Sequence, residues 1–149
     1  MTVPTWCRAL LVAVAIPQGV AGVWAVLAPE NWYERFPGFD PRLVIATTGD
    51  FNEHLASDAG AGLLASAVVL LLAALWPERR IVIVACVAFL SFSLPHALHH
   101  TLNPAPGLTG AEDVRNVITL WIAVVAPAVV LYAAARLREP ARLLEDIPA

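Results

Sequence analysis

Four long apolar runs constrain this chain more than any other feature. They cover 9–28, 55–76, 81–100 and 117–135, and Asp58 is the one Asp, Glu, Lys or Arg residue within them. A membrane-crossing helix needs about 20 mostly apolar residues. Only helices and closed barrels satisfy their backbone polar groups in lipid. The sequence therefore predicts an all-α, integral membrane four-helix bundle, with a single domain over 1–149.

Composition agrees with a bilayer as the main partner. Hydrophobic residues make up 59% of the chain and charged residues 14%, whereas soluble domains have roughly 45–50% and about 25%. A net charge of −3 gives no reason to expect a nucleic-acid partner. Cys7 and Cys86 are far apart, so they form neither a disulfide framework nor a zinc motif.

All nine basic residues are arginine, and their positions predict an orientation. Cytoplasmic loops are enriched in Lys and Arg. A cytoplasmic N-terminus places six arginines inside and three outside: Arg8, Arg79, Arg80, Arg136, Arg138 and Arg142 against Arg35, Arg42 and Arg115. We therefore expect a multi-pass cell-membrane protein with both termini cytoplasmic. The first run is long for a signal peptide, which favours an uncleaved span.

Local patterns add expectations about helix ends and packing. Asp50 with Glu53, and Thr109 with Glu112, have the capping-box spacing and predict helix starts near 51 and 110. Trp32 and Tyr33 are expected at the outer membrane interface, and Trp6 and Trp76 at the inner one. Small residues at 57, 61 and 65, and at 62 and 66, predict a close helix contact on that face.

All four histidines lie in two short stretches, "NEHLASDAG" from Asn52 and "PHALHH" from Pro95. Four residues join the second and third runs, so these helices should be antiparallel neighbours. This arrangement places the start of one helix beside the end of the other. Ionisable groups at membrane depth usually pair and face the bundle interior. We therefore predict one outer-end site formed by His54, Asp58, His96 and His100, with His99 and Glu53 as alternates.

Three interpretations of this site remain open. Imidazole and carboxylate ligands suit a divalent metal such as zinc, iron or manganese, and an open position would permit redox or hydrolytic chemistry on a lipid-like small molecule. A haem with one histidine from each helix is the second. The third is a structural polar network between helices. Gln18, Asp113 and Asn116 are further candidates for the same site.

The two stretches also suggest a family. They resemble the NEHLxxDxG and PHxxxH motifs of uncharacterised actinobacterial four-helix membrane proteins, whose layout is DoxX-like. The resemblance covers most of the chain, and the matching positions are Asn52, Glu53, His54, Asp58, Gly60, His96 and His100. Ser57 and Asn103 depart from the family pattern, in which a basic residue and a further histidine are common. The resemblance implies the fold and the place of the site, but no particular reaction.

Overall fold

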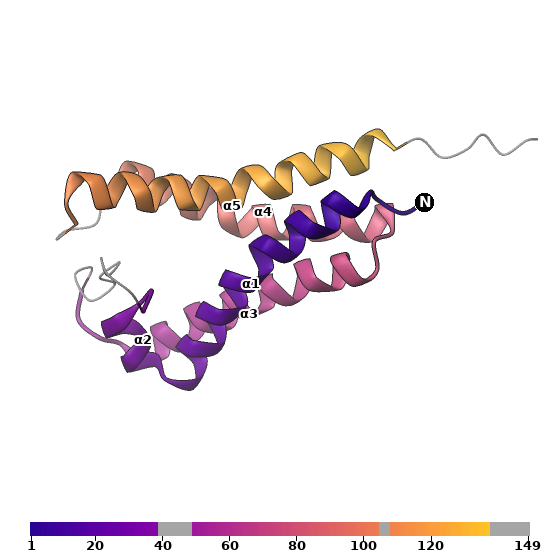
Figure 1. Cartoon of the computed structure of the whole chain (residues 1–149). Helices are drawn as coiled ribbons and strands as arrows, with labels where there is room; N and C mark the ends of the chain where they lie inside the picture. Colours follow the sequence, from indigo (N-terminus) through magenta and orange to yellow (C-terminus); the bar gives the residue numbers. More distant parts are fainter. Residues whose placement is uncertain (39–48, 105–107, 138–149) are drawn as a thin grey trace, which may run out of the picture.

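The computed structural model describes residues 1–38, 49–104 and 108–137, and these residues are helical as predicted (Figure 1). Four helices are long and apolar enough to cross a membrane: α1 (Thr5–Leu27), α3 (Glu53–Leu75), α4 (Arg79–Leu102) and α5 (Gly110–Arg136). The short α2 (Pro29–Arg35) follows α1. The predicted all-α membrane bundle is confirmed. Each spanning helix begins two to seven residues before its predicted apolar run.

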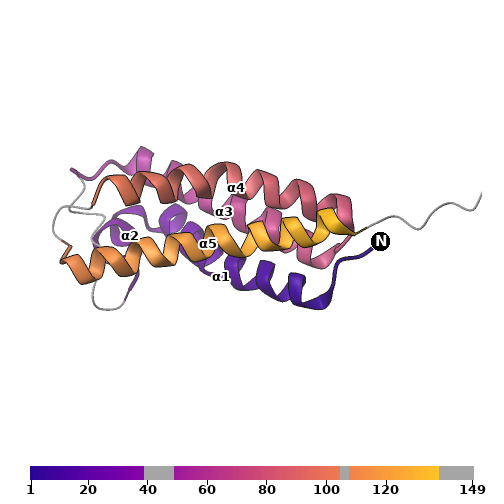
Figure 2. The ribbon, with the colours of Figure 1, turned by 90° about the horizontal axis from the view of Figure 1, so that it is seen from above.

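The bundle consists of two helix pairs. α1 packs along α3, α4 packs along α5, and the ring of contacts is completed by α3 with α4 and α5 with α1. The α3–α4 turn makes these two helices antiparallel neighbours, as expected. Away from that turn the two pairs diverge, so that Figure 1 shows α4 and α5 separating from α1 and α3. Viewed from above, all four helices run along the same long axis (Figure 2).

Glycine allows α1 and α3 to cross with their backbones in contact. A Cβ on Gly22 would lie 2.5 Å from the Leu64 nitrogen, and one on Gly60 would lie 2.7 Å from the Ala25 Cβ. Neither distance is sterically possible, so both positions require glycine. Close approach of this kind is the usual way in which small residues stabilise helix pairs in lipid, where burial of apolar surface gives no driving force.

The small-residue face that packs is not the predicted one. Ala61 and Ala65 are exposed, and a Cβ on Gly62 would meet no atom within 4 Å. Ala56, Gly60 and Ala67 are buried instead. The prediction was wrong because α3 has small residues on two faces, and α1 supplies its complementary glycine to only one of them.

The main core lies at the end of the bundle that contains the N-terminal segment and the α3–α4 turn. We name this end the inner end, after its predicted side, and the opposite end the outer end. It contains residues from all four long helices, among them Leu11, Leu70, Phe89 and Val130. The N-terminal segment pairs with the α3–α4 turn: the Val3 amide donates to the Pro77 carbonyl, and the Arg79 amide donates to the Met1 carbonyl. This pairing fixes the inner ends of α1 and α4 at the same level.

Two arginine side chains close the inner end. The Arg8 guanidinium donates to the Ala74 carbonyl at 2.9 Å, and the Arg79 guanidinium donates to the Ala134 carbonyl at 3.0 Å. Both carbonyls lie in the last turn of a helix, where no amide four residues ahead continues the helix and the dipole favours a cation. The Ala134 carbonyl also accepts from the Leu137 amide at 3.3 Å. Arg42, Arg138 and Arg142, which also entered the orientation argument, lie outside the described residues.

A second, smaller core holds α2 against the outer ends of α1 and α3. Trp32 is 7% exposed and packs against Ala25 and Ala56. Its ring centroid is 5.8 Å from that of Phe36. Trp32 therefore belongs to this core at the outer ends of α1 and α3, and its interfacial depth stays a prediction. The inner-end Trp6 and Trp76 are exposed.

Candidate functional site at the outer end of the bundle

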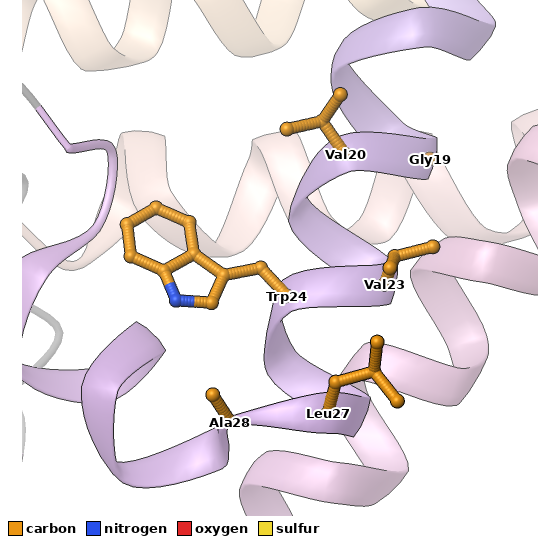
Figure 3. Close-up of a pocket in the computed structure, with 6 residues that line it drawn as sticks. All are labelled: Gly19, Val20, Val23, Trp24, Leu27 and Ala28. Atoms are coloured by element: carbon orange, nitrogen blue, oxygen red, sulfur yellow. The ribbon is translucent and has the colours of Figure 1, made fainter.

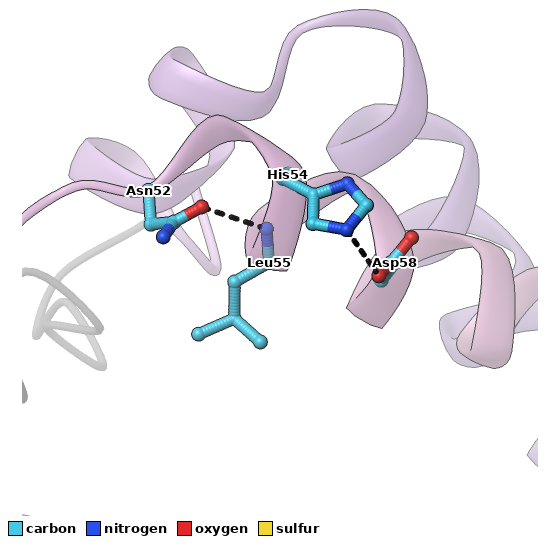
Figure 4. Close-up of polar contacts among 4 residues, drawn as sticks. All are labelled: Asn52, His54, Leu55 and Asp58. Atoms are coloured by element: carbon cyan, nitrogen blue, oxygen red, sulfur yellow. Dashed lines mark hydrogen bonds and ion pairs between the residues drawn. The ribbon is translucent and has the colours of Figure 1, made fainter.

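His54 and Asp58 form a pair on α3 that faces away from the other helices. The His54 Nε2 lies 3.4 Å from the Asp58 Oδ2, and the two side chains are 89% and 65% exposed. Figure 4 shows the imidazole turned along the helix surface toward the carboxylate. The predicted contact between residues one turn apart on α3 is present, but it lies on the outer surface of the bundle.

The packing of α1 on α3 explains this orientation. His54 precedes Gly60 by six residues, which at about 100° per residue places it roughly 120° around the helix from the glycine contact. Gly60 must face α1 because only a glycine fits there. The same rotation turns His54 and Asp58 away from the α1 contact and leaves them exposed. The sequence predicts the depth of these side chains. It does not predict the rotation of α3 about its axis, because that rotation depends on how α3 packs against α1.

His96 and His100 lie on the face of α4 that continues from the core. Phe89, Ser93, His96 and His100 follow one helical stripe at spacings of four, three and four residues. Phe89 and Ser93 are 1% and 5% exposed. Beyond them His96 is exposed and His100 is half-buried, because the helix pairs diverge at this end. The stripe therefore leads from the core to two histidines that face the space between the pairs.

Ring contacts hold these side chains in a row. The His96 and His100 ring centroids are 4.7 Å apart in an edge-on arrangement, and Phe92 stacks on His96 at 5.5 Å. His99 lies on the flank, 5.5 Å from His100. An Asn103 side-chain nitrogen lies 3.4 Å from the His99 Nδ1. The aromatic neighbours limit the rotation of each imidazole.

α5 contributes a carboxylate to this end of α4. Asp113 interacts electrostatically with His100, and its Oδ1 is buried without a hydrogen-bond partner within the part of the chain that the structure describes. The Trp121 indole donates to the Thr101 hydroxyl at 3.1 Å and joins the same two helices. Seven residues join α4 to α5, against three between α3 and α4. A connection of seven residues is still short, so the neighbour argument could also have paired His100 with Asp113.

The predicted set of four ligands is split between two places. His54 and Asp58 lie together on α3, and His96 and His100 lie together on α4, but the helix rotation separates the two pairs. Within 1–38, 49–104 and 108–137, no group of three or more His, Cys, Asp or Glu side chains is placed to hold a metal ion. Glu53 is the first residue of α3 and is exposed. The single four-residue site is therefore not assembled in the described chain.

An open groove of about 500 Å³ lies on α1 and has an almost wholly apolar lining. Figure 3 shows Val20 and Trp24 on one side of it and Val23 and Leu27 on the other. The indole nitrogen of Trp24 donates to the Asn31 Oδ1 at 2.9 Å. A groove without free polar groups on a membrane-spanning helix suits lipid chains, and it offers no groups for catalysis.

Comparison with known proteins leaves the family open. No family model, curated protein or solved structure matches the chain. The similarity to actinobacterial four-helix proteins with NEHLxxDxG and PHxxxH motifs therefore stays a prediction.

Proposed function

We propose that this multi-pass membrane protein binds a divalent transition metal ion at His96 and His100, with Asp113 as a third ligand. The observation that carries the proposal is the pair of imidazoles one turn apart on the interior stripe of α4. Two histidines at this spacing on one helix face are a common half of a metal site. The Asp113 oxygen that lacks a partner is a suitable additional donor.

The proposal requires rearrangement of side chains, since the three groups do not form a ligand set in the described structure. Metal binding would offset the cost of ordering them. Zinc, iron and manganese all accept imidazole and carboxylate ligands. With three protein ligands, one coordination position would stay open for water or a small molecule from the membrane, which is the arrangement that Lewis-acid or redox chemistry needs.

The geometry gives less support to haem. Two axial histidines must face each other across the porphyrin, and the candidate partner on α3, His54, is 89% exposed and paired with Asp58. A structural role is the stronger alternative. The Thr101–Trp121 hydrogen bond and the interaction of His100 with Asp113 both join α4 to α5, and a network of this kind would stabilise the pair without any ligand.

Metal content per chain tests the proposal. The detergent-purified protein is loaded separately with Zn²⁺, Fe²⁺ or Mn²⁺, and bound metal is measured by mass spectrometry for the wild type, His96→Ala, His100→Ala and His54→Ala. His54 is the matched control, because it lies at similar depth on the other face. We expect close to one ion per wild-type chain, retention in His54→Ala and loss in the other two.

Two results would contradict the proposal. Absence of bound metal in the wild type, with lower thermal stability in His100→Ala, would support the structural network. Equal loss of metal in all three variants would instead support the predicted site that α3 and α4 share.

We also propose that both termini are cytoplasmic. Arg8, Arg79 and Arg136 belong to helix ends that meet at the inner end of the bundle, in line with the enrichment of arginine in cytoplasmic loops.

A further inference from the structure

Two buried polar atoms in the middle of the bundle lack hydrogen-bond partners. They are the Gln18 Oε1 on α1 and the Ser93 Oγ on α4, and neither has a partner in the described residues. Ser93 is only 5% exposed. Buried polar atoms in proteins are nearly always hydrogen-bonded, to water or a ligand where no protein group is available. An unsatisfied serine hydroxyl deep in a membrane bundle therefore needs an explanation.

The two atoms lie at the same level. Gln18 follows the start of α1 by 13 residues, and Ser93 follows the start of α4 by 14. At about 1.5 Å per residue, each lies roughly 20 Å from the inner end of its helix. The pairing of the N-terminal segment with the α3–α4 turn sets those two ends side by side. Both residues are therefore near the middle of the membrane.

Both side chains also point toward the centre of the bundle. Gln18 follows Leu11 and Ala15 on the core stripe of α1, and Ser93 follows Phe89 on that of α4. Each lies one turn beyond the last residue that its helix contributes to the main core, Ala15 on α1 and Phe89 on α4. α1 and α4 are diagonal in the ring of contacts, which runs from α1 through α3, α4 and α5. The two residues thus lie at a similar level on diagonal helices that have no direct contact with each other.

We propose that a molecule with a hydroxyl group bridges Gln18 and Ser93 at this level. The Gln18 oxygen can only accept a hydrogen bond, whereas the Ser93 hydroxyl can donate or accept. An O–H group that donates to Gln18 and accepts from Ser93 satisfies both. The hydroxyl can belong to a buried water or to a small lipid-like molecule. Ser93 lies on the same helical stripe as His96 and His100, one turn closer to the core, and is not one of the proposed metal ligands.

Stability measurements on apolar variants distinguish this proposal from the alternative, in which nothing binds and the Gln18 and Ser93 oxygens stay without hydrogen-bond partners. If nothing binds there, Gln18→Leu and Ser93→Ala remove an unsatisfied group, so the melting temperature should rise or stay the same. If a hydroxyl bridges the pair, each substitution removes one of its partners and should lower the melting temperature. The melting temperature of the double variant should then be no lower than that of the less stable single variant, because both changes break the same bridge.

Ser91→Ala is the matched control. Ser91 is exposed on the same helix, and its hydroxyl donates to the Val87 carbonyl at 2.8 Å, so its loss should change the melting temperature little. Destabilisation in both single variants, without additivity in the double variant, would support the bridge. Unchanged or raised melting temperatures, or strictly additive losses, would overturn it.

Native mass spectrometry identifies the source of the hydroxyl. A bound mass on the wild type that disappears in Ser93→Ala indicates a small molecule, whereas coupled stability without added mass indicates water. The inference does not depend on the proposed metal. Metal content should be unchanged in Ser93→Ala, so failure of one proposal leaves the other intact.

Discussion

At the scale of single residues, glycine decides which side chains of α3 face the bundle. Gly60 and Gly62 are two positions apart, yet one is buried against α1 and the other faces open space. Their chemistry is identical, so only the partner helix distinguishes them. The contact at Gly60 in turn sets the direction of His54 and Asp58. A backbone contact thus determines which ionisable groups can share a site.

The two glycines should respond with opposite sign to the same substitution. Gly60→Ala forces a Cβ to within 2.7 Å of the Ala25 Cβ, and overpacking of this kind costs about 1–3 kcal/mol. Gly62→Ala meets nothing and gains helix propensity worth up to ~1 kcal/mol. Thermal unfolding in one detergent is the measurement. A similar loss in both variants would show that the α1–α3 crossing is elsewhere.

At the scale of helices, the residue that caps a helix start could be predicted where no second capping residue lay near it. Thr109 and Glu112 form the predicted capping box, in which the threonine hydroxyl accepts from the Glu112 amide and the carboxylate accepts from the Thr109 amide. The predicted capping box of Asp50 with Glu53 was wrong. α3 is capped by Asn52, whose side chain accepts from the Leu55 amide at 3.0 Å (Figure 4). Asn and Asp are equally good caps, so the sequence could not choose between positions 50 and 52.

The candidate site shows the same limit. Sequence patterns predicted the helices and the depth of each histidine, because both follow from apolar length and rise per residue. Rotation about a helix axis depends on which faces pack, and α3 has small residues on two faces. His96 and His100 continue the stripe of α4 that contains the core residue Phe89, with His96 exposed and His100 half-buried. His54 had no such guide, and the carboxylate that interacts electrostatically with His100 is Asp113 on α5.

At the scale of the whole molecule, the bundle is closed at its inner end and divergent at its outer end. The N-terminal segment, the α3–α4 turn and two arginine-to-carbonyl hydrogen bonds join the inner ends. The interior-facing histidines lie where the helix pairs diverge. A ligand that approaches from the outer side would therefore meet His96 and His100 before the core.

Labelling of a turn residue tests the orientation of the whole bundle. Glu78 is exposed in the α3–α4 turn, whereas both native cysteines, Cys7 and Cys86, are buried. A membrane-impermeant maleimide should therefore label Glu78→Cys only after the cells are permeabilised, and the wild type serves as background. Labelling of the variant in intact cells would place this turn outside and reverse the proposed topology.

The central claim is that α4 and α5, and not α3 and α4, build the outer-end site. Oxidative cross-linking of introduced cysteine pairs tests it most directly, with disulfide-linked peptides identified by mass spectrometry. The account predicts rapid cross-linking in His100→Cys with Asp113→Cys, and little in His54→Cys with His100→Cys. Equal or faster cross-linking between positions 54 and 100 would contradict it, since His54 would then face α4.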